Sequence, residues 1–231
     1  MIEDPLVRIA RHLPRPSPRL AGRPLSSYAS YVALGDSFTA GTACPPGQRW
    51  PDRLARALRA HNPDLIYRNV AREGATSADV LEQLGPALQL EPDLATVICG
   101  ANDVLVSVRP DIEACAARLA EIFDQLRSAL PGVVILTATA PERWRFLRLG
   151  PRTRRRTLDG LRRLNAATRT LAQERSIPLL DVANHPGLED PSNFSDDGLH
   201  PSSLGHARAA REFEQLLLGR PDPQSQTGGL R

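Results

Sequence analysis

The chain of 231 residues contains no lysine, only three cysteines and few aromatic residues, which make up 4% of it. The cysteines are scattered at Cys44, Cys99 and Cys115 without Cys-x-x-Cys spacing, which argues against a disulfide framework and against a zinc site. All 29 basic residues are arginine, yet the net charge is only +3, so charge does not indicate a nucleic-acid-binding protein.

Long hydrophobic runs are absent as well. No apolar stretch approaches the roughly 18 residues that span a bilayer, and the first residues, Met1 to Pro24, alternate Arg, Pro and His where a signal peptide would have an apolar core. We therefore expect a soluble, cytoplasmic protein with no membrane insertion and no nucleic-acid partner, present as a monomer or weak homo-oligomer.

The remaining composition, 41% hydrophobic, suits one domain with a proper core. Residues 1–27 are rich in Pro and Arg without apolar periodicity, and residues 221–231 are polar and rich in Gly and Pro. The pattern predicts a flexible N-terminal extension over 1–27, a folded domain over 28–220 and a disordered tail over 221–231.

Within that domain, short apolar runs alternate with helical patterns. The runs are Tyr31 to Leu34, Leu65 to Val70, Leu94 to Cys99, Val133 to Thr139 and Ile177 to Val182, and the clearest helical patterns are 50–60, 112–130, 157–175 and 201–218. This alternation predicts an α/β fold, a three-layer α/β/α sandwich around a five-stranded parallel sheet with right-handed crossovers.

Four segments that follow these runs contain unusual polar residues. They are Gly35-Asp36-Ser37, the loop around Gly74, Gly100-Ala-Asn102-Asp103, and Ser195 to His200. Ligands of open α/β sheets bind beyond the carboxyl ends of the strands, so these segments are expected to form one surface.

A serine hydroxyl becomes a good nucleophile only when a base takes its proton. Asp197 and His200 offer an orienting carboxylate and a base, because imidazole titrates near neutral pH. Acyl transfer also needs fixed donors for a developing oxyanion, and the Asn102 amide and the main chain at Gly74 suit that task. The alternative for Ser37 is a turn serine that caps a helix.

Together, Gly-Asp-Ser, the glycine after the second strand, Gly-x-Asn-Asp and Asp-x-x-His resemble the SGNH/GDSL hydrolases over roughly Tyr31 to Leu218. The resemblance implies a flavodoxin-like strand order and an esterase that acts on carboxylic esters of lipids, carbohydrates or small acyl groups without a cofactor. It also implies the roles of five residues: Ser37 as nucleophile, His200 as base, Asp197 as its orienter, and the Ser37 and Gly74 amides with the Asn102 side chain as oxyanion donors.

Neighbouring carboxylates are interpreted differently. Asp36 and Asp103 are expected to fix loop amides by hydrogen bonds. Asp196 competes with Asp197 as the residue that orients His200, and the family spacing favours Asp197. The other histidines are expected to be surface or packing residues. No His, Cys and Asp cluster has the spacing of metal ligands, so no metal site is predicted.

An arginine-rich stretch, Arg143 to Arg156, follows the fourth predicted strand and contains Trp144 and Phe146. It is either a solvated helix start or a rim that holds an anionic part of the substrate. Glu73 departs from the small residue that related members often have there, and it complicates the anionic hypothesis by placing a negative charge near the same region.

Two alternative functions remain at this stage. One is acyl transfer to an alcohol or amine through the same acyl-enzyme, and the other is a non-catalytic anion-binding or RNA-binding module that uses the arginine-rich stretch.

Overall fold

A parallel sheet forms the centre of the molecule. The computed structural model describes residues 23–142, 149–183 and 185–219. Its strands are β1 (Ser30–Gly35), β2 (Ile66–Asn69), β3 (Leu94–Ile98), β4 (Val134–Ala138) and β5 (Leu179–Leu180). They pair in the order β2-β1-β3-β4-β5, all in parallel. Both the predicted five-stranded parallel sheet and the flavodoxin-like order that the resemblance implies are confirmed.

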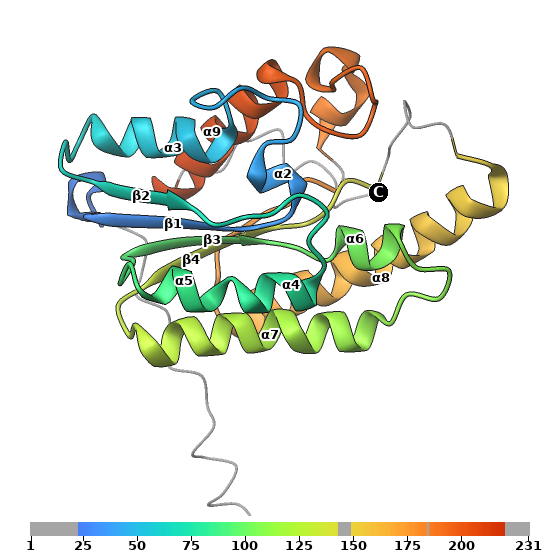
Figure 1. Cartoon of the computed structure of the whole chain (residues 1–231), viewed down its shortest axis with the longest axis horizontal. Coiled ribbons are helices and arrows are strands. Elements are labelled where there is room, and N and C mark those ends of the chain that lie inside the picture. Colours follow the sequence, from blue (N-terminus) through green and yellow to red (C-terminus); the bar gives the residue numbers. More distant parts are fainter. Residues whose placement is uncertain (1–22, 143–148, 184, 220–231) are drawn as a thin grey trace, which may run out of the picture.

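Helices cover both faces of this sheet. The longer ones are α3 (Trp50–Arg59), α7 (Ile112–Ala129), α8 (Pro151–Glu174) and α9 (Ser203–Leu217), and the short ones are α2 (Ser37–Ala40), α4 (Ser77–Glu82), α5 (Leu84–Leu88) and α6 (Ala101–Leu105). The 3-10 turns are η2 (Leu25–Ser27), η3 (Pro186–Glu189) and η4 (Pro191–Asn193). Figure 1 shows α3 and α9 on one face and α4, α5 and α7 on the other, with α8 beside α7. The layers are those of the predicted three-layer sandwich.

Side chains of β1 alternate between the two faces because successive residues of a strand point to opposite sides. Tyr31 and Ala33 join the core beneath α3 and α9, whereas Val32 and Leu34 join the core beneath α4, α5 and α7. All four side chains are fully buried. Strand β1 is therefore covered on both sides, which explains why its sequence is an unbroken apolar run.

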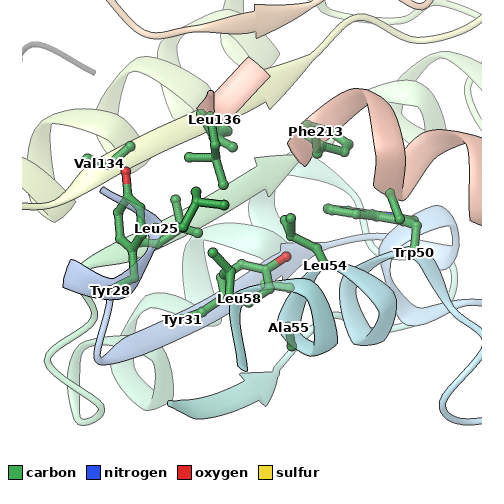
Figure 2. Close-up of a cluster of buried hydrophobic side chains, with 14 of the residues drawn as sticks. Leu25, Tyr28, Tyr31, Trp50, Leu54, Ala55, Leu58, Val134, Leu136 and Phe213 are labelled. Atoms are coloured by element: carbon green, nitrogen blue, oxygen red, sulfur yellow. The ribbon is translucent and has the colours of Figure 1, made fainter. Parts of the chain in front are cut away.

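Large aromatic and aliphatic side chains fill the first of these cores (Figure 2). Trp50, at the start of α3, stacks on Phe213 of α9 with ring centroids 4.5 Å apart. Its indole N–H donates to the carbonyl of Phe38 in α2 at 3.0 Å. One tryptophan thus ties α3 and α9 to the short helix that follows β1.

Several boundaries differ from the sequence-based predictions, among them the start of α8 and the end of the N-terminal extension. Helix α8 begins at Pro151, six residues before the predicted start at 157, because Gly150 is extended and Pro151 suits a first helical position. Of the predicted extension, residues 1–22 lie outside the described residues, whereas Leu25 is buried in the core. Most of the predicted tail, 221–231, also lies outside them. No helix in the described part of the chain is long and apolar enough to cross a membrane.

Candidate active site

Ser37 is the first residue of α2, directly beyond the carboxyl end of β1. The helix is capped by Asp36, whose carboxylate accepts from the Phe38 amide at 3.0 Å. The capping role considered for Ser37 is therefore filled by its neighbour, and the Ser37 hydroxyl is available for another contact. The predicted structural role of Asp36 as a residue that fixes loop amides is confirmed.

Gly35 brings this turn close to the next strand. A Cβ at Gly35 would lie 2.5 Å from the carbonyl oxygen of Ile98 and 2.6 Å from the Thr39 hydroxyl, so no larger residue fits there. Buried Gln83 holds the same glycine from the other side: its carbonyl accepts from the Gly35 N–H at 2.8 Å and its amide donates to the Gly35 carbonyl at 2.9 Å. Gln83 is not predictable from the sequence, because no local motif distinguishes it from a surface glutamine.

The Ser37, His200 and Asp197 side chains meet in one line of hydrogen bonds. His200 Nε2 lies 3.0 Å from Ser37 Oγ, and His200 Nδ1 lies 2.6 Å from Asp197 Oδ2. Ser37 and His200 are 163 positions apart in the sequence, and the fold brings them together at the carboxyl edge of the sheet. A carboxylate on Nδ1 leaves Nε2 free to accept the serine proton.

Asp197, and not Asp196, is the carboxylate that contacts His200. Its other oxygen accepts from the His200 and Leu199 amides at 2.9 and 2.8 Å and from the Ser195 hydroxyl at 2.8 Å. Partial burial by itself would raise the pKa of Asp197, but these hydrogen bonds outweigh it and hold that pKa well below the usual range for a carboxyl group. Asp197 is therefore ionised across the pH range in which histidine titrates.

Three N–H groups beside Ser37 lack an acceptor among the described residues. Two of them are the main-chain amides of Ser37 and Gly74. The third is one of the two N–H groups of the Asn102 side chain, whose other N–H donates to the Ala75 carbonyl at 3.0 Å. All three residues line one cavity. The structure thus brings together every residue that the sequence analysis placed at the site.

Asp103 links the loops that support these donors. Its two oxygens accept from the amide and hydroxyl of Ser77 at 2.7 and 2.6 Å, and Arg118 lies 3.9 Å from it. The expectation that Asp103 fixes loop amides is confirmed. At Asp36, burial raises the pKa to about 6 despite the Phe38 hydrogen bond and the nearby His200.

A cavity of about 300 Å³ opens at Ser37 and His200. Most of the surface that lines it is apolar, and the larger apolar residues there are Phe38, Ile98, Leu105, Pro141, Leu180, Val182, Leu188, Phe194 and Leu199. Polar exceptions at its rim include Glu73 and Arg208. Such a lining suits an apolar group on the substrate.

The described arginines of the predicted anion-binding rim do not line this cavity. Residues 143–148 lie outside the described residues, and Arg152, Arg154 and Arg155 belong to the first turns of α8. The cavity's arginine among the described residues is Arg208, which is bound to Asp190 and to Asn193 at 2.7 Å each. Nothing described therefore supports an anionic substrate held by Arg152, Arg154 or Arg155 in the cavity.

Within the described residues, no three His, Cys, Asp or Glu side chains come together as a possible metal site. The chemistry available at the site consists of a hydroxyl, an imidazole, a carboxylate and N–H donors.

Comparison with known proteins identifies a family of hydrolases. Residues 33–208 match the model of the GDSL-like Lipase/Acylhydrolase family. An arylesterase of Vibrio mimicus is 28% identical over 188 residues, covering 81% of this chain and 87% of the relative. A GDSL lipase of Mycobacterium tuberculosis is 26% identical over 198 residues, covering 80% of each chain.

Solved structures share the fold at lower identity. An esterase from Pseudoalteromonas sp., in a structure inhibited by monoethylphosphonate, superposes with a TM-score of 0.65 at 18% identity, covering 82% of this chain and 96% of that one. An acetylxylan esterase from Geobacillus stearothermophilus superposes with a TM-score of 0.62 at 21% identity, covering 82% and 94%. These likenesses extend over most of the described domain.

Proposed function

Because the chain belongs to the GDSL-like lipase/acylhydrolase family and is an ester hydrolase of that family, we propose that it cleaves carboxylic esters through an acyl-enzyme on Ser37. The observation that carries this proposal is the continuous contact from Ser37 Oγ through His200 to Asp197, at 3.0 and 2.6 Å.

In the first half of the reaction, Ser37 Oγ attacks the ester carbonyl while His200 Nε2 accepts the hydroxyl proton. The carbonyl oxygen becomes an oxyanion, for which the Ser37 and Gly74 amides and the Asn102 side chain are the available donors. His200 then returns the proton to the departing alkoxide, and the acyl group stays on Ser37.

In the second half, a water molecule takes the place of the alcohol. His200 accepts a proton from the water, the resulting hydroxide attacks the acyl-enzyme, and the carboxylic acid leaves as Ser37 recovers its proton. Asp197, ionised throughout, orients the imidazole and stabilises its charged form. The Asp197 side chain is 45% exposed, so water has access to this end of the site.

The substrate proposed on these grounds is an ester whose acyl or aryl group is apolar and small enough for a cavity of about 300 Å³. Support comes from the apolar lining of the cavity and from the relatives, an arylesterase and an acetylxylan esterase.

Labelling and substitution of Ser37 test the proposal. An alkyl phosphonate is expected to inactivate the enzyme and to add its mass to the peptide that contains Ser37. Ser37→Ala is expected to prevent labelling and to lower kcat on a short-chain nitrophenyl ester at least about 10³-fold. Ser128→Ala, at an exposed serine of α7, is the matched control. Full activity of the Ser37→Ala protein would contradict the acyl-enzyme.

A further inference from the structure

Arginines gather at a second hollow, between the loop that follows α6 and the first turns of α8. The residues that line it are Arg109, Pro110, Arg152, Arg155, Arg156, Asp159, Gly160 and Arg163. The five arginines of this hollow and two valines of the adjoining loop, Val106 and Val108, are together called the arginine–valine surface. Five guanidinium groups against one carboxylate leave this surface strongly positive.

Four of these arginines are unpaired within the described part of the chain. Arg109, Arg152, Arg155 and Arg163 make no salt bridge or side-chain hydrogen bond with any described residue. Some guanidinium groups elsewhere hold carboxylates, as Arg169 holds Asp181 at 2.8 Å. Side chains of like charge repel one another when they share a hollow, and Asp159 is the one carboxylate among the described residues that line it, so an anionic ligand would relieve this repulsion.

The Nε atom of Arg156, which lines the same hollow, is buried and is also without a hydrogen-bond partner among the described residues. A buried donor without an acceptor is uncommon, because losing water without a replacement is unfavourable. An incoming anion, or the water around it, would supply acceptors close to this side chain.

The valines add an apolar component. Val106 is 73% exposed and Val108 is 81% exposed, the highest values among the exposed large hydrophobic residues described. They precede Arg109 in one short loop. That loop rests on α8, since Gly160 of the helix lies against Val104 and Pro110. Valines and arginines are therefore displayed by one packed unit.

This surface adjoins the mouth of the catalytic cavity. Asn102 and Leu105 of α6 line the cavity, and Val106 is the next residue along the chain. Figure 1 shows the loop after α6 and the start of α8 at the same end of the molecule, beyond the carboxyl ends of the strands. A large partner on the surface would lie next to the cavity that holds Ser37.

We infer that the arginine–valine surface docks the enzyme on an anionic lipid surface, with the arginines against headgroup phosphates and the two valines in the interfacial layer. Clustered basic residues attract anionic membranes, and exposed aliphatic side chains add affinity by leaving water. RNA is the less suitable polyanion, because single strands are bound by stacking on aromatic side chains and the described residues here include none. Docking goes beyond the proposed hydrolysis and does not depend on it.

Vesicle sedimentation with the full chain tests the docking. The protein is expected to sediment with vesicles of phosphatidylcholine and phosphatidylglycerol, to stay in solution with phosphatidylcholine alone, and to be released by added salt. Ser37→Ala is expected to bind equally well, so that failure of docking and failure of the esterase mechanism are separate results.

Matched variants locate the binding. The double variant Arg152→Gln, Arg155→Gln is expected to lower the partition coefficient for anionic vesicles roughly 30-fold. The control Arg68→Gln, Arg211→Gln removes the same charge from exposed arginines on β2 and α9, and it is expected to have a much smaller effect. All variants are expected to hydrolyse a soluble nitrophenyl ester at the wild-type rate, and thermal unfolding confirms that each is folded.

The valines have their own control. Val106→Ser with Val108→Ser is expected to weaken binding to anionic vesicles at least several-fold, and Ile66→Ser, at an aliphatic residue of β2 that is 59% exposed, is expected not to. The inference would be overturned if the protein bound neutral and anionic vesicles equally well. It would also be overturned if the two double arginine variants lost the same amount of binding, or if the double valine variant lost none. Binding to single-stranded RNA that depends on the arginines, without vesicle binding, would overturn it as well.

Discussion

At the scale of single residues, the Asn102 side chain is held in place by the bond that it makes outside the cavity. One amide N–H donates to the Ala75 carbonyl at 3.0 Å, which fixes the amide plane while its second N–H has no acceptor among the described residues. A fixed donor stabilises an oxyanion without reorganising during the reaction.

Asn102→Ala is expected to lower kcat by about 10²–10³-fold with little change in KM, because the lost interaction belongs to the transition state. Steady-state kinetics on a neutral nitrophenyl ester measures this. Asn62→Ala is the control, because Asn62 also donates its amide to a main-chain carbonyl, that of Tyr28 at 2.9 Å. An equal fall of kcat in both variants would show that Asn102 acts only through stability.

Glu73 is a carboxylate in the lining of the cavity. It is exposed, lines the cavity beside Gly74 and forms no ion pair or side-chain hydrogen bond with any described residue. A carboxylate in this position disfavours an anionic substrate, which argues against the hypothesis that the arginine-rich stretch holds an anionic part of the substrate.

Glu73→Gln is expected to raise kcat/KM for an ester with a carboxylate on its alcohol about 3- to 10-fold, and to leave a neutral ester of the same shape unchanged. Added salt should reduce the difference, because it screens exposed charges. Glu113→Gln, at an exposed glutamate of α7, is the control for net charge. A gain that is equal for both esters would exclude an electrostatic origin.

At the scale of elements, the segment with Asp197 and His200 is supported by the start of α9. The Ser202 amide donates to the Asn193 carbonyl at 2.8 Å, and Ser195 and His200 are joined by a main-chain hydrogen bond of 2.8 Å. Gly205 packs directly against the Asn193 carbonyl. The loop geometry therefore depends on a residue without a side chain in the first turn of α9.

Gly205→Ala is expected to push this loop away from Ser37, because the new methyl group would overlap the Asn193 carbonyl oxygen. We expect a loss of about 1–3 kcal/mol in the free energy of unfolding and a fall in kcat. Gly85→Ala in α5 is the control, since nothing lies within 4 Å of the position of its Cβ. Denaturant unfolding and kinetics check both variants, and an unaffected kcat in Gly205→Ala would separate the loop from catalysis.

At the scale of the whole molecule, His206 connects the core to the pH dependence of stability. It is fully buried on α9, where its ring stacks on Phe38 and its Nδ1 accepts from the Trp50 amide at 3.2 Å. Burial, reinforced by the charges of Arg53 and Arg49, lowers the pKa of His206 to about 4. The unfolded chain therefore takes up a proton on this side chain at a higher pH than the folded chain does.

Stability is accordingly expected to fall as the pH drops from about 6.5 to about 4, by about 3 kcal/mol from this residue alone. The contribution of Asp36 to stability changes with pH in the opposite direction. Because its pKa is raised in the folded chain, folding becomes less favourable as the pH rises from 3.8 to about 6. His206→Gln is expected to be less stable than the wild type at pH 7 and to lose less stability on acidification. Urea unfolding at several pH values measures this, and parallel pH profiles would contradict it.

Much of the architecture is predictable because it depends on local periodicity. The apolar runs locate all five strands, and the order of elements predicts the parallel sheet. The short helices α2, α4, α5 and α6 were not predicted. Segments of four to six residues contain too few turns to show a helical pattern, and their stability comes from packing and caps such as Asp36.

The sequence by itself determined the fold class and the set of residues at the site, since Ser37, Gly74, Asn102, Asp197 and His200 each follow a strand or stand in the last loop. Only the tertiary structure decided which distant groups touch: that His200 reaches Ser37, that Gln83 holds Gly35, and that the described arginines of α8 surround a different hollow. The physical reason is range. Periodicity and turn residues act between neighbours in the chain, whereas hydrogen bonds and charges depend on distances across the fold that no local pattern encodes.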